Sequence, residues 1–296
     1  MRVAMRGTAS RFTGSLYAFG AVLIWGFTFV PSKLALVELG PFTLAVLRFA
    51  VALLVLVTIV RSRQSRPARP ARDSYPSLVL MGVTGVALFF GFQNLALGRT
   101  SATDAGLISG SVPAFTAAAS GLLLKERLGP VRLTGIALSI AGVATMVLSS
   151  ASSGGSSLEG DLLMLGAVLA WVVYTLVLKR AGETVPEAQL LVYTMAVGLV
   201  CLLPVAGFEV IQTGVAPVSL TAWLSVLFLG VAGSAGAFFC WNAAVRNLDA
   251  TEASTYINLV PPVTVVSAAL FLGETLGVAQ GAGGALVLLG VYLAGR

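Results

Sequence analysis

A six-residue stretch, GAVLIW at residues 20–25, returns as GAVLAW at residues 166–171, and this pair decides the fold. A lysine follows each tryptophan at the same distance, as Lys33 and Lys179, so both matches share an offset of 146 residues. A sequence rich in Ala, Val and Leu matches itself by chance at scattered positions. Tryptophan and lysine recurring in the same order indicate an internal repeat.

The repeat continues through the rest of the chain at an offset of 148 residues. The matching polar, proline and glycine positions are Asn94 with Asn242, Thr103 with Thr251, Pro113 with Pro261, Glu126 with Glu274, Gly135 with Gly283, and Gly142 with Gly290. Matches of these residue types in order indicate a duplication. We therefore divide the chain into two related units, residues 1–149 and 150–296.

Composition assigns both units to a membrane. Of the 296 residues, 57% are hydrophobic and only 10% are charged, whereas charged residues make up about 25% of a soluble domain. A bilayer core of about 30 Å takes about 20 apolar residues in a helix. Ten such stretches are present, at residues 14–36, 41–60, 76–97, 102–123, 130–149, 160–179, 187–207, 220–243, 250–271 and 276–294.

The odd number of spans in each unit sets the topology. Long continuous apolar runs predict helices, because the strands of a membrane β-barrel would alternate apolar and polar residues. Five helices bring the chain to the other side of the membrane, so the second unit enters in the opposite direction. The predicted fold is an all-α integral membrane protein with ten transmembrane helices in two inverted five-helix repeats, a common build of secondary carriers.

Basic residues predict the orientation. If the N-terminus is cytoplasmic, Arg99 is the only basic residue in the outer loops, and the Arg-rich linker 61–74 is a cytoplasmic loop beside anionic lipid headgroups. The inner side then collects Arg2, Arg6, Arg11, Arg61, Arg63, Arg66, Arg69, Arg72, Lys125, Arg127, Arg132, Lys179, Arg180, Arg246 and Arg296. This bias predicts a multi-pass protein of the bacterial inner membrane with both termini cytoplasmic.

Several function classes lack their key residues. The chain has no His, which excludes Ser/His or Cys/His nucleophile pairs and His-ligated zinc. Cys201 and Cys240 lie in apolar stretches and are expected to pack rather than to bind metal. No Walker A motif is present, so this chain does not itself use ATP. We predict no enzymatic activity, no metal, no cofactor and no nucleic-acid partner; a lipid-modifying enzyme would need polar groups converging at one depth, and the intramembrane charges are scattered.

Trp25, Trp171, Pro113 and Pro261 map halfway along their predicted helices. Proline removes a backbone donor and loosens a helix, which a membrane tolerates beside a cavity or beside side chains that satisfy the freed carbonyls. The repeated placement near the midplane, the depth expected for a carrier's site, favours a binding cavity. The alternative is a packed kink with tryptophan as filler.

Arg48 lies about 10 Å into the helix 41–60. An intramembrane arginine is costly and is a candidate for substrate binding, the alternatives being snorkelling to headgroups or a bond to a carbonyl. The second unit has Tyr193, or a close neighbour, at this place, so the charge is not duplicated. The amide and aromatic residues expected to line the cavity are Phe90, Gln93, Asn94, Trp241, Asn242, Tyr256 and Asn258. Such a lining suits an apolar or aromatic zwitterion better than a phosphate.

The remaining intramembrane charges lie near helix ends. Glu126 and Glu274 precede helix starts, where a carboxylate accepts hydrogen bonds from free amides, and Asp104 and Glu252 in first helical turns invite the same explanation. These two first-turn carboxylates would also be among the few groups available for proton coupling. Lys33 is expected to snorkel to the outer headgroups.

The sequence resembles the drug/metabolite transporter superfamily, in particular its EamA-type members. The resemblance covers the whole chain and is carried by the two Gly-Ala-Val-Leu-x-Trp copies, by Leu47-Arg48-Phe49, and by Glu126 and Glu274 before helices 5 and 10. It implies two inverted repeats around a central cavity and alternating access. Many members export amino acids or related metabolites, and the chain looks most like the YddG-type amino-acid exporters.

These observations predict a secondary transporter that exports small organic metabolites, foremost amino acids with aromatic or apolar side chains, across the inner membrane. Its partners would be the substrate and the lipid bilayer, with one chain forming the carrier. A passive channel, or an exporter of another small metabolite or drug, is the alternative.

Overall fold

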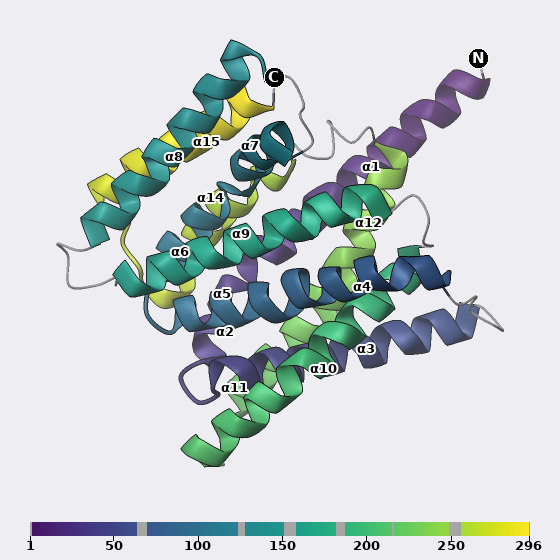
Figure 1. Cartoon of the computed structure of the whole chain (residues 1–296), viewed down its shortest axis with the longest axis vertical. Coiled ribbons are helices and arrows are strands. Elements are labelled where there is room, and N and C mark those ends of the chain that lie inside the picture. Colours follow the sequence, from purple (N-terminus) through teal and green to yellow (C-terminus); the bar gives the residue numbers. More distant parts are fainter. Residues whose placement is uncertain are drawn as a thin grey trace.

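The computed structural model describes residues 2–63, 70–123, 128–150, 158–181, 187–214, 216–248 and 256–295, and every regular element in these ranges is helical (Figure 1). Within these ranges, eight helices are long and apolar enough to cross a membrane, and two shorter apolar helices, Val260–Leu272 and Val278–Ala294, complete the ten predicted stretches. The membrane-spanning all-α class is therefore confirmed.

The first repeat builds its five spans from several consecutive helices. They are α1 (Arg2–Phe27), α2 (Phe29–Ala35), α3 (Pro41–Arg63), η1 (Arg72–Ser74), α4 (Tyr75–Gly82), η2 (Val83–Leu88), α5 (Phe89–Leu97), α6 (Ala102–Ser109), α7 (Val112–Leu123) and α8 (Pro130–Ser150). The pairs α1–α2 and α6–α7, and the run from η1 to α5, each correspond to one predicted span.

The second repeat follows the same plan. Its helices are α9 (Leu158–Ala181), α10 (Glu187–Thr213), α11 (Leu220–Phe228), η3 (Leu229–Gly236), α12 (Ala237–Asn247), α14 (Val260–Leu272) and α15 (Val278–Ala294). We call the end near Arg11 and Gly295 the termini end, and the end formed by loops 36–40, 98–101 and 273–277 the opposite end. Both chain termini lie on the upper side of Figure 1.

The fourth and ninth spans break at equivalent places. We expected continuous helices at 102–123 and 250–271, but the helix is interrupted at Gly110–Ser111 and again at Asn258–Leu259. Residues 110 and 258 are one repeat offset apart. Each break lies just before its proline, Pro113 or Pro261, in the first turn of the helix that follows. Proline is tolerated in a first turn, where its missing amide has no helical partner to lose.

Two π-helical segments also occupy equivalent places, η2 in the third span and η3 in the eighth. The sequence did not predict them, because an extra residue in a helical turn leaves the apolar pattern almost unchanged. Such bulges are frequent at functional sites. Both segments lie beside the cavity described below.

The fifth and tenth spans pack through glycines that face one another. A Cβ at Gly135 would lie 2.5 Å from the Gly290 carbonyl oxygen, and a Cβ at Gly142 would lie 2.5 Å from that of Gly283. Gly135 and Gly142 are the repeat counterparts of Gly283 and Gly290, so each glycine meets the counterpart of the other. This reciprocity is the signature of a two-fold interface between inverted copies. Figure 1 shows α8 and α15 side by side.

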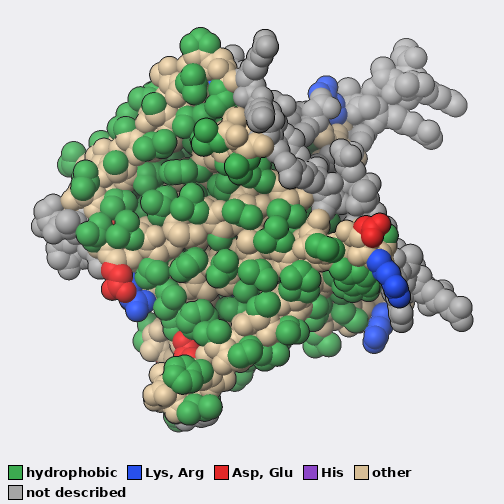
Figure 2. All heavy atoms as spheres, in the orientation of Figure 1, with side chains coloured by type: hydrophobic (Ala, Val, Ile, Leu, Met, Phe, Trp, Pro, Cys, Tyr) green, Lys and Arg blue, Asp and Glu red, His purple; other side chains and the backbone are tan. Residues whose placement is uncertain are grey.

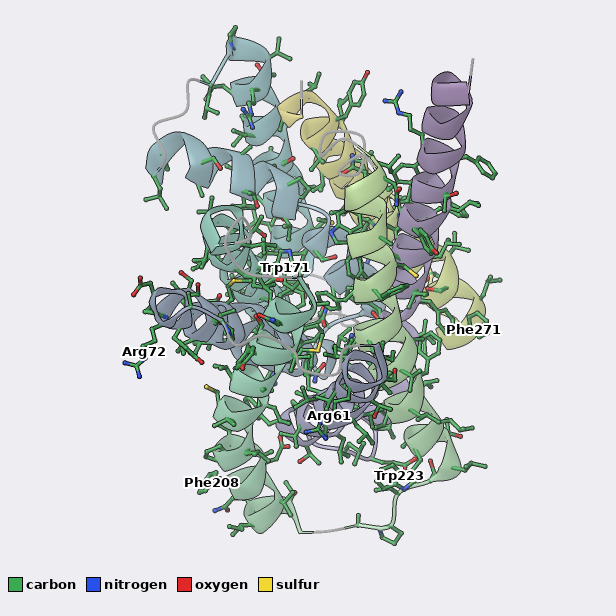
Figure 3. The ribbon with its side chains drawn as sticks, turned by 90° about the vertical axis from the view of Figure 1, so that its right-hand side faces the viewer. Arg61, Arg72, Trp171, Phe208, Trp223 and Phe271 are labelled. Atoms are coloured by element: carbon green, nitrogen blue, oxygen red, sulfur yellow. The ribbon has the colours of Figure 1, made fainter. Side chains whose placement is uncertain are left out.

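The outer surface suits lipid. Hydrophobic side chains cover most of the face in Figure 2, and the charged side chains visible there gather toward its margins. Phe208, Trp223 and Phe271 lie at the periphery in Figure 3 and are 64%, 49% and 63% exposed. In water such a surface would be unstable, whereas in a bilayer it carries no penalty.

Carboxylates tie the loops together at the opposite end. Glu38 accepts hydrogen bonds from the amide and the hydroxyl of Ser219, at 2.6 Å each. Glu209 accepts from the amide and the hydroxyl of Thr43, at 2.7 Å each. Each contact joins one repeat to the other at a free helix N-terminus, where a negative charge is stabilised.

The facing glycines of α8 and α15, which we call the glycine seam, limit the size of the side chains that this interface accepts. Gly142→Ala would push a methyl group into the Gly283 carbonyl, and we expect it to lower the free energy of unfolding by about 1–3 kcal/mol. Gly20→Ala is the matched control, because a Cβ there meets nothing within 4 Å. Thermal unfolding of the two variants in detergent measures the difference. Equal melting temperatures would mean that the seam yields to an added methyl group.

The Glu38 contact predicts a small pH dependence. The Ser219 hydroxyl, followed by the Ser219 amide, holds the pKa of the Glu38 carboxyl below its ordinary value. A carboxyl with a lowered pKa stabilises the folded protein at neutral pH, and the benefit is lost as the pH falls through that pKa. Glu38→Gln should therefore melt below the wild type at neutral pH, with a gap that closes on acidification. A gap that is the same at every pH would contradict this account.

Candidate functional site

The structure contains a cavity of about 830 Å³ between the two repeats. It extends from mid-depth side chains to Arg132, Tyr292 and Gly295 at the termini end. Spans from both repeats contribute to its wall. The lining side chains with a ring, a polar group or a charge are Trp25, Thr28, Phe29, Arg48, Phe89, Phe90, Gln93, Ser109, Thr116, Ser120, Arg132, Trp171, Thr175, Phe238, Asn258 and Tyr292.

Aromatic rings form the deep wall. The Trp25 and Trp171 rings, which are repeat counterparts, both contact Phe238, with centroid distances of 5.4 and 6.5 Å. Phe89 lies 4.8 Å from Trp171. Figure 3 shows Trp171 in the middle of the helices. Edge-on and tilted pairs of this kind make a rigid apolar surface.

Seven of the twelve residues predicted from the sequence line the cavity. They are Trp25, Arg48, Phe90, Gln93, Pro113, Trp171 and Asn258. Pro113 and Asn258 belong to the two helix breaks, where the interrupted backbone leaves space. The structure thus brings together three of the four midplane residues that the repeat singled out, Trp25, Trp171 and Pro113.

Four of the predicted residues do not line the cavity. Asn94 is buried and donates from Nδ2 to the Pro41 carbonyl at 2.8 Å, so it joins two helices. Trp241 and Tyr256 pack against a buried apolar cluster near the termini end, and the Trp241 ring also lies 5.6 Å from the ring of Trp25 behind the cavity wall. Pro261 fills the space above Gly110. The twelfth residue, Asn242, has a side chain outside the described set.

The cavity also holds residues that we did not predict. Phe238 is the repeat counterpart of Phe90, so extending the prediction through the repeat would have found it. Phe89 adjoins a predicted residue, but hydropathy does not tell a ring facing lipid from one facing a cavity. The hydroxyl residues Thr28, Ser109, Thr116, Ser120 and Thr175 carry no sequence signal, because such groups are also satisfied by their own helices. In the described part of the chain, no three His, Cys, Asp or Glu side chains cluster as metal ligands.

Charged side chains close the opposite end. Glu274 accepts hydrogen bonds from the amides of Ala102 and Thr103 at 2.8 Å each. Lys33 Nζ lies 4.0 Å from a Glu274 oxygen and donates to the Thr100 carbonyl. These contacts tie α2, α6 and the loop before α15 together.

Asp104 completes this closed end. Fully buried, it exchanges hydrogen bonds with Ser101 and accepts from Gln280 Nε2 at 2.9 Å to each oxygen.

The structure corrects two expectations for this end. Glu274 accepts hydrogen bonds from amides at the start of α6 rather than from those of α15, which follows it, because the start of α6 lies beside the loop before α15. Lys33 turns inward to Thr100 instead of snorkelling, since acceptors lie within reach. Glu126, the repeat counterpart of Glu274, and Glu252, the repeat counterpart of Asp104, lie outside the described residues.

The two repeat-related tryptophans differ in their bonding. Trp25 Nε1 donates to the carbonyl of Gly233 in the π-helical η3, at 3.2 Å. The equivalent contact would run from Trp171 to Gly85 in η2. No such bond forms between these two described residues; the Trp171 ring instead packs 4.7 Å from Tyr174.

The same difference separates two threonines. Thr264, fully buried, donates from Oγ1 to the Gly26 carbonyl at 3.0 Å. Its repeat counterpart, Thr116, has a hydroxyl without a hydrogen-bond partner in the described structure and lines the cavity. The equivalent acceptor would be the Val172 carbonyl. The hydrogen bonds of Trp25 and Thr264 are therefore formed, whereas the equivalent bonds of Trp171 and Thr116 are not.

Comparisons with known proteins agree with this architecture. The chain is 32% identical to an uncharacterized transporter of Archaeoglobus fulgidus over 277 residues, covering 92% of this chain and 93% of that protein. It is 29% identical to a probable amino-acid metabolite efflux pump of Salmonella typhimurium, with coverage of 92% and 91%. A probable terminal-alkyne amino-acid exporter of Streptantibioticus cattleyicolor is 30% identical, with coverage of 75% and 73%.

A solved crystal structure shares the fold. It aligns over 96% of both chains with a TM-score of 0.65 and 22% sequence identity. The model of the EamA-like transporter family matches the chain twice, at residues 12–148 and 158–296. The two matches show the same five-helix unit in each half, and the family is one of transporters rather than enzymes. The chain therefore belongs to the EamA-like transporter family.

Proposed function

We propose that the protein is a secondary carrier that exports small organic metabolites, with apolar and aromatic amino acids as the leading substrate class. The cavity carries this proposal, because it is large, central and sealed at one end. Its volume of about 830 Å³ lies within the usual range for small-molecule sites, roughly 300–1,000 Å³. The contacts at Lys33, Asp104 and Glu274 block a continuous pore, which favours a carrier over a passive channel.

The lining supports a substrate with an apolar body. Trp25, Phe89, Trp171 and Phe238 supply flat ring surfaces, while Gln93 and Asn258 supply amide groups that can orient a polar end. The names of two relatives, an amino-acid metabolite efflux pump and an amino-acid exporter, agree with such a substrate. A phosphorylated substrate would call for a larger cluster of basic groups.

The unequal halves support a mechanism of alternating access. Inverted repeats can exchange conformations, so that the second repeat adopts the arrangement of the first. Trp171 would then donate to the Gly85 carbonyl and Thr116 to the Val172 carbonyl, while Trp25 and Thr264 would release their acceptors. In this exchange, each of the two hydrogen bonds would be replaced by its repeat counterpart.

The positions of the basic residues indicate the direction of transport. The basic linker and the basic termini end favour a cytoplasmic location for the side on which the cavity opens. One chain in the bacterial inner membrane, with both termini cytoplasmic, would then load substrate from the cytoplasm and release it outside.

Counterflow in proteoliposomes tests the proposed function. Vesicles preloaded with one amino acid should take up the same labelled amino acid against its gradient, and uptake should saturate. A panel of amino acids, run with and without a pH gradient, identifies substrates and proton coupling. Trp171→Ala should lower the rate at least about tenfold, since it removes the central ring, while Trp223→Ala, at the lipid surface, serves as the control. Flux that never saturates would indicate a channel, and no counterflow for any amino acid would remove this substrate class.

Cysteine labelling tests alternating access. Leu176 lines the cavity, whereas its repeat counterpart Val30 is 1% exposed near the sealed end. In a background without Cys201 and Cys240, Leu176→Cys should react with a membrane-impermeant thiol reagent added at the termini side. Val30→Cys should react only from the other side, and faster during turnover. Labelling of both cysteines from one side would contradict the exchange of conformations.

A further inference from the structure

Arg48 is a cation buried in the interior of the membrane-spanning region. It belongs to α3 and is only 2% exposed. Its Nε donates to Ser234 Oγ at 2.7 Å, and its guanidinium carbon lies 4.4 Å from the centre of the Phe90 ring. Within the described chain, no carboxylate forms an ion pair with it.

These contacts leave most of the guanidinium unsatisfied. An arginine carries five N–H donors, and the hydrogen bond to Ser234 in the described structure uses only the one on Nε. A phenyl ring and a neutral hydroxyl do not neutralise a buried charge, which is costly without an anion. Because Arg48 lines the cavity, the free donors on Nη1 and Nη2 are available to a molecule inside it.

The charges around the cavity have one sign. Among the described lining residues, the charged side chains are Arg48 in the deep wall and Arg132 at the termini end. The Nε of Arg132 also lacks a hydrogen-bond partner in the described structure. No Asp or Glu belongs to the lining residues, and Asp104 and Glu274 are occupied in the sealed end. Both charges attract an anion that enters the cavity and repel a cation.

We propose that Arg48 binds the carboxylate of the substrate, so that the cavity selects carboxylate-bearing solutes with an apolar body and rejects the corresponding cationic amines. The fork of Nη1 and Nη2 matches a carboxylate, and the rings of Trp171 and Phe238, which line the same cavity, would hold the apolar part. This inference rests on the proposed function for the identity of the cavity as a transport site. It adds that the amino group of an amino acid contributes little to binding.

The asymmetry of the repeats makes this a single site. The corresponding position in the second repeat falls at or next to Tyr193, whose ring packs 6.2 Å from Tyr75, away from the cavity. One guanidinium thus serves both states of the carrier. It would hold one carboxylate per transport cycle.

Three probes with one phenyl body and different charges test the inference. They are phenylalanine, 3-phenylpropionate and phenethylamine, each added to the purified full-length protein in nanodiscs. Ligand-induced thermal stabilisation reports binding without requiring transport. We expect stabilisation by the two carboxylates and none by phenethylamine. The same selectivity should hold for inhibition of counterflow in proteoliposomes.

Variants assign this selectivity to Arg48. Arg48→Gln should weaken binding of 3-phenylpropionate about 10- to 100-fold, the usual effect of losing a charged hydrogen bond. Arg48→Lys should retain part of the binding, because it keeps the charge but loses the fork. Arg61→Gln, on the same helix but exposed at its end, is the matched control. If Arg48→Gln does not fold, the Arg48→Lys variant and the wild-type preference among the probes decide the question.

The outcomes separate the two proposals. Charge-selective binding without counterflow would overturn the carrier function and leave the carboxylate site standing. Counterflow of phenylalanine with equal binding of phenethylamine would overturn the carboxylate site and leave the carrier standing. Unchanged affinity in Arg48→Gln, or no binding of any probe to the wild type, would also overturn the carboxylate site, and Arg48 would then only join α3 to η3 through Ser234.

Discussion

An odd number of membrane spans in each repeat is the constraint on which the rest of this structure depends. Five spans force the second copy to enter lipid in the opposite direction, so equivalent helices run antiparallel to one another. The glycine contacts at Gly135 with Gly290 and Gly142 with Gly283 are direct products of this geometry. So is the cavity, which forms where the fourth and ninth spans break at matching positions.

Polar groups are distributed as a membrane requires. Carboxylates at the opposite end are held by free helix amides, as Glu274 is by α6 and Glu209 by α3. Such groups cost little because the hydrogen bonds are charge-assisted and short. The interior follows a different rule, since Arg48 is buried beside a hydroxyl and an aromatic ring without a neutralising anion. The carboxylates at the opposite end therefore hold helices together, whereas the Arg48 guanidinium keeps donors available for a molecule in the cavity.

Much of the fold could be predicted from the sequence, and less of the cavity. The spans, the repeat and the midplane positions of Trp25, Trp171 and Pro113 follow from hydropathy and self-similarity. The rotation of each helix does not, because lipid and an apolar cavity wall select the same residues. Asn94 was therefore placed on the right helix, but its side chain joins that helix to α3 instead of facing the cavity, and Phe238 was missed. Lys33 was misjudged because its acceptors come from a segment distant in the sequence.

The seam between α8 and α15 also bears on how such a chain could arise. Ser139 donates to the carbonyl of Val287, which is its own counterpart in the other repeat, at 3.2 Å. A position that meets its own counterpart lies on the pseudo-two-fold axis, where two separate copies of one ancestral unit would present the same residue to itself. Any substitution there would have changed both sides of an ancestral homodimer at once. Fusion of the copies would remove that coupling and allow serine at one of the two equivalent positions and valine at the other.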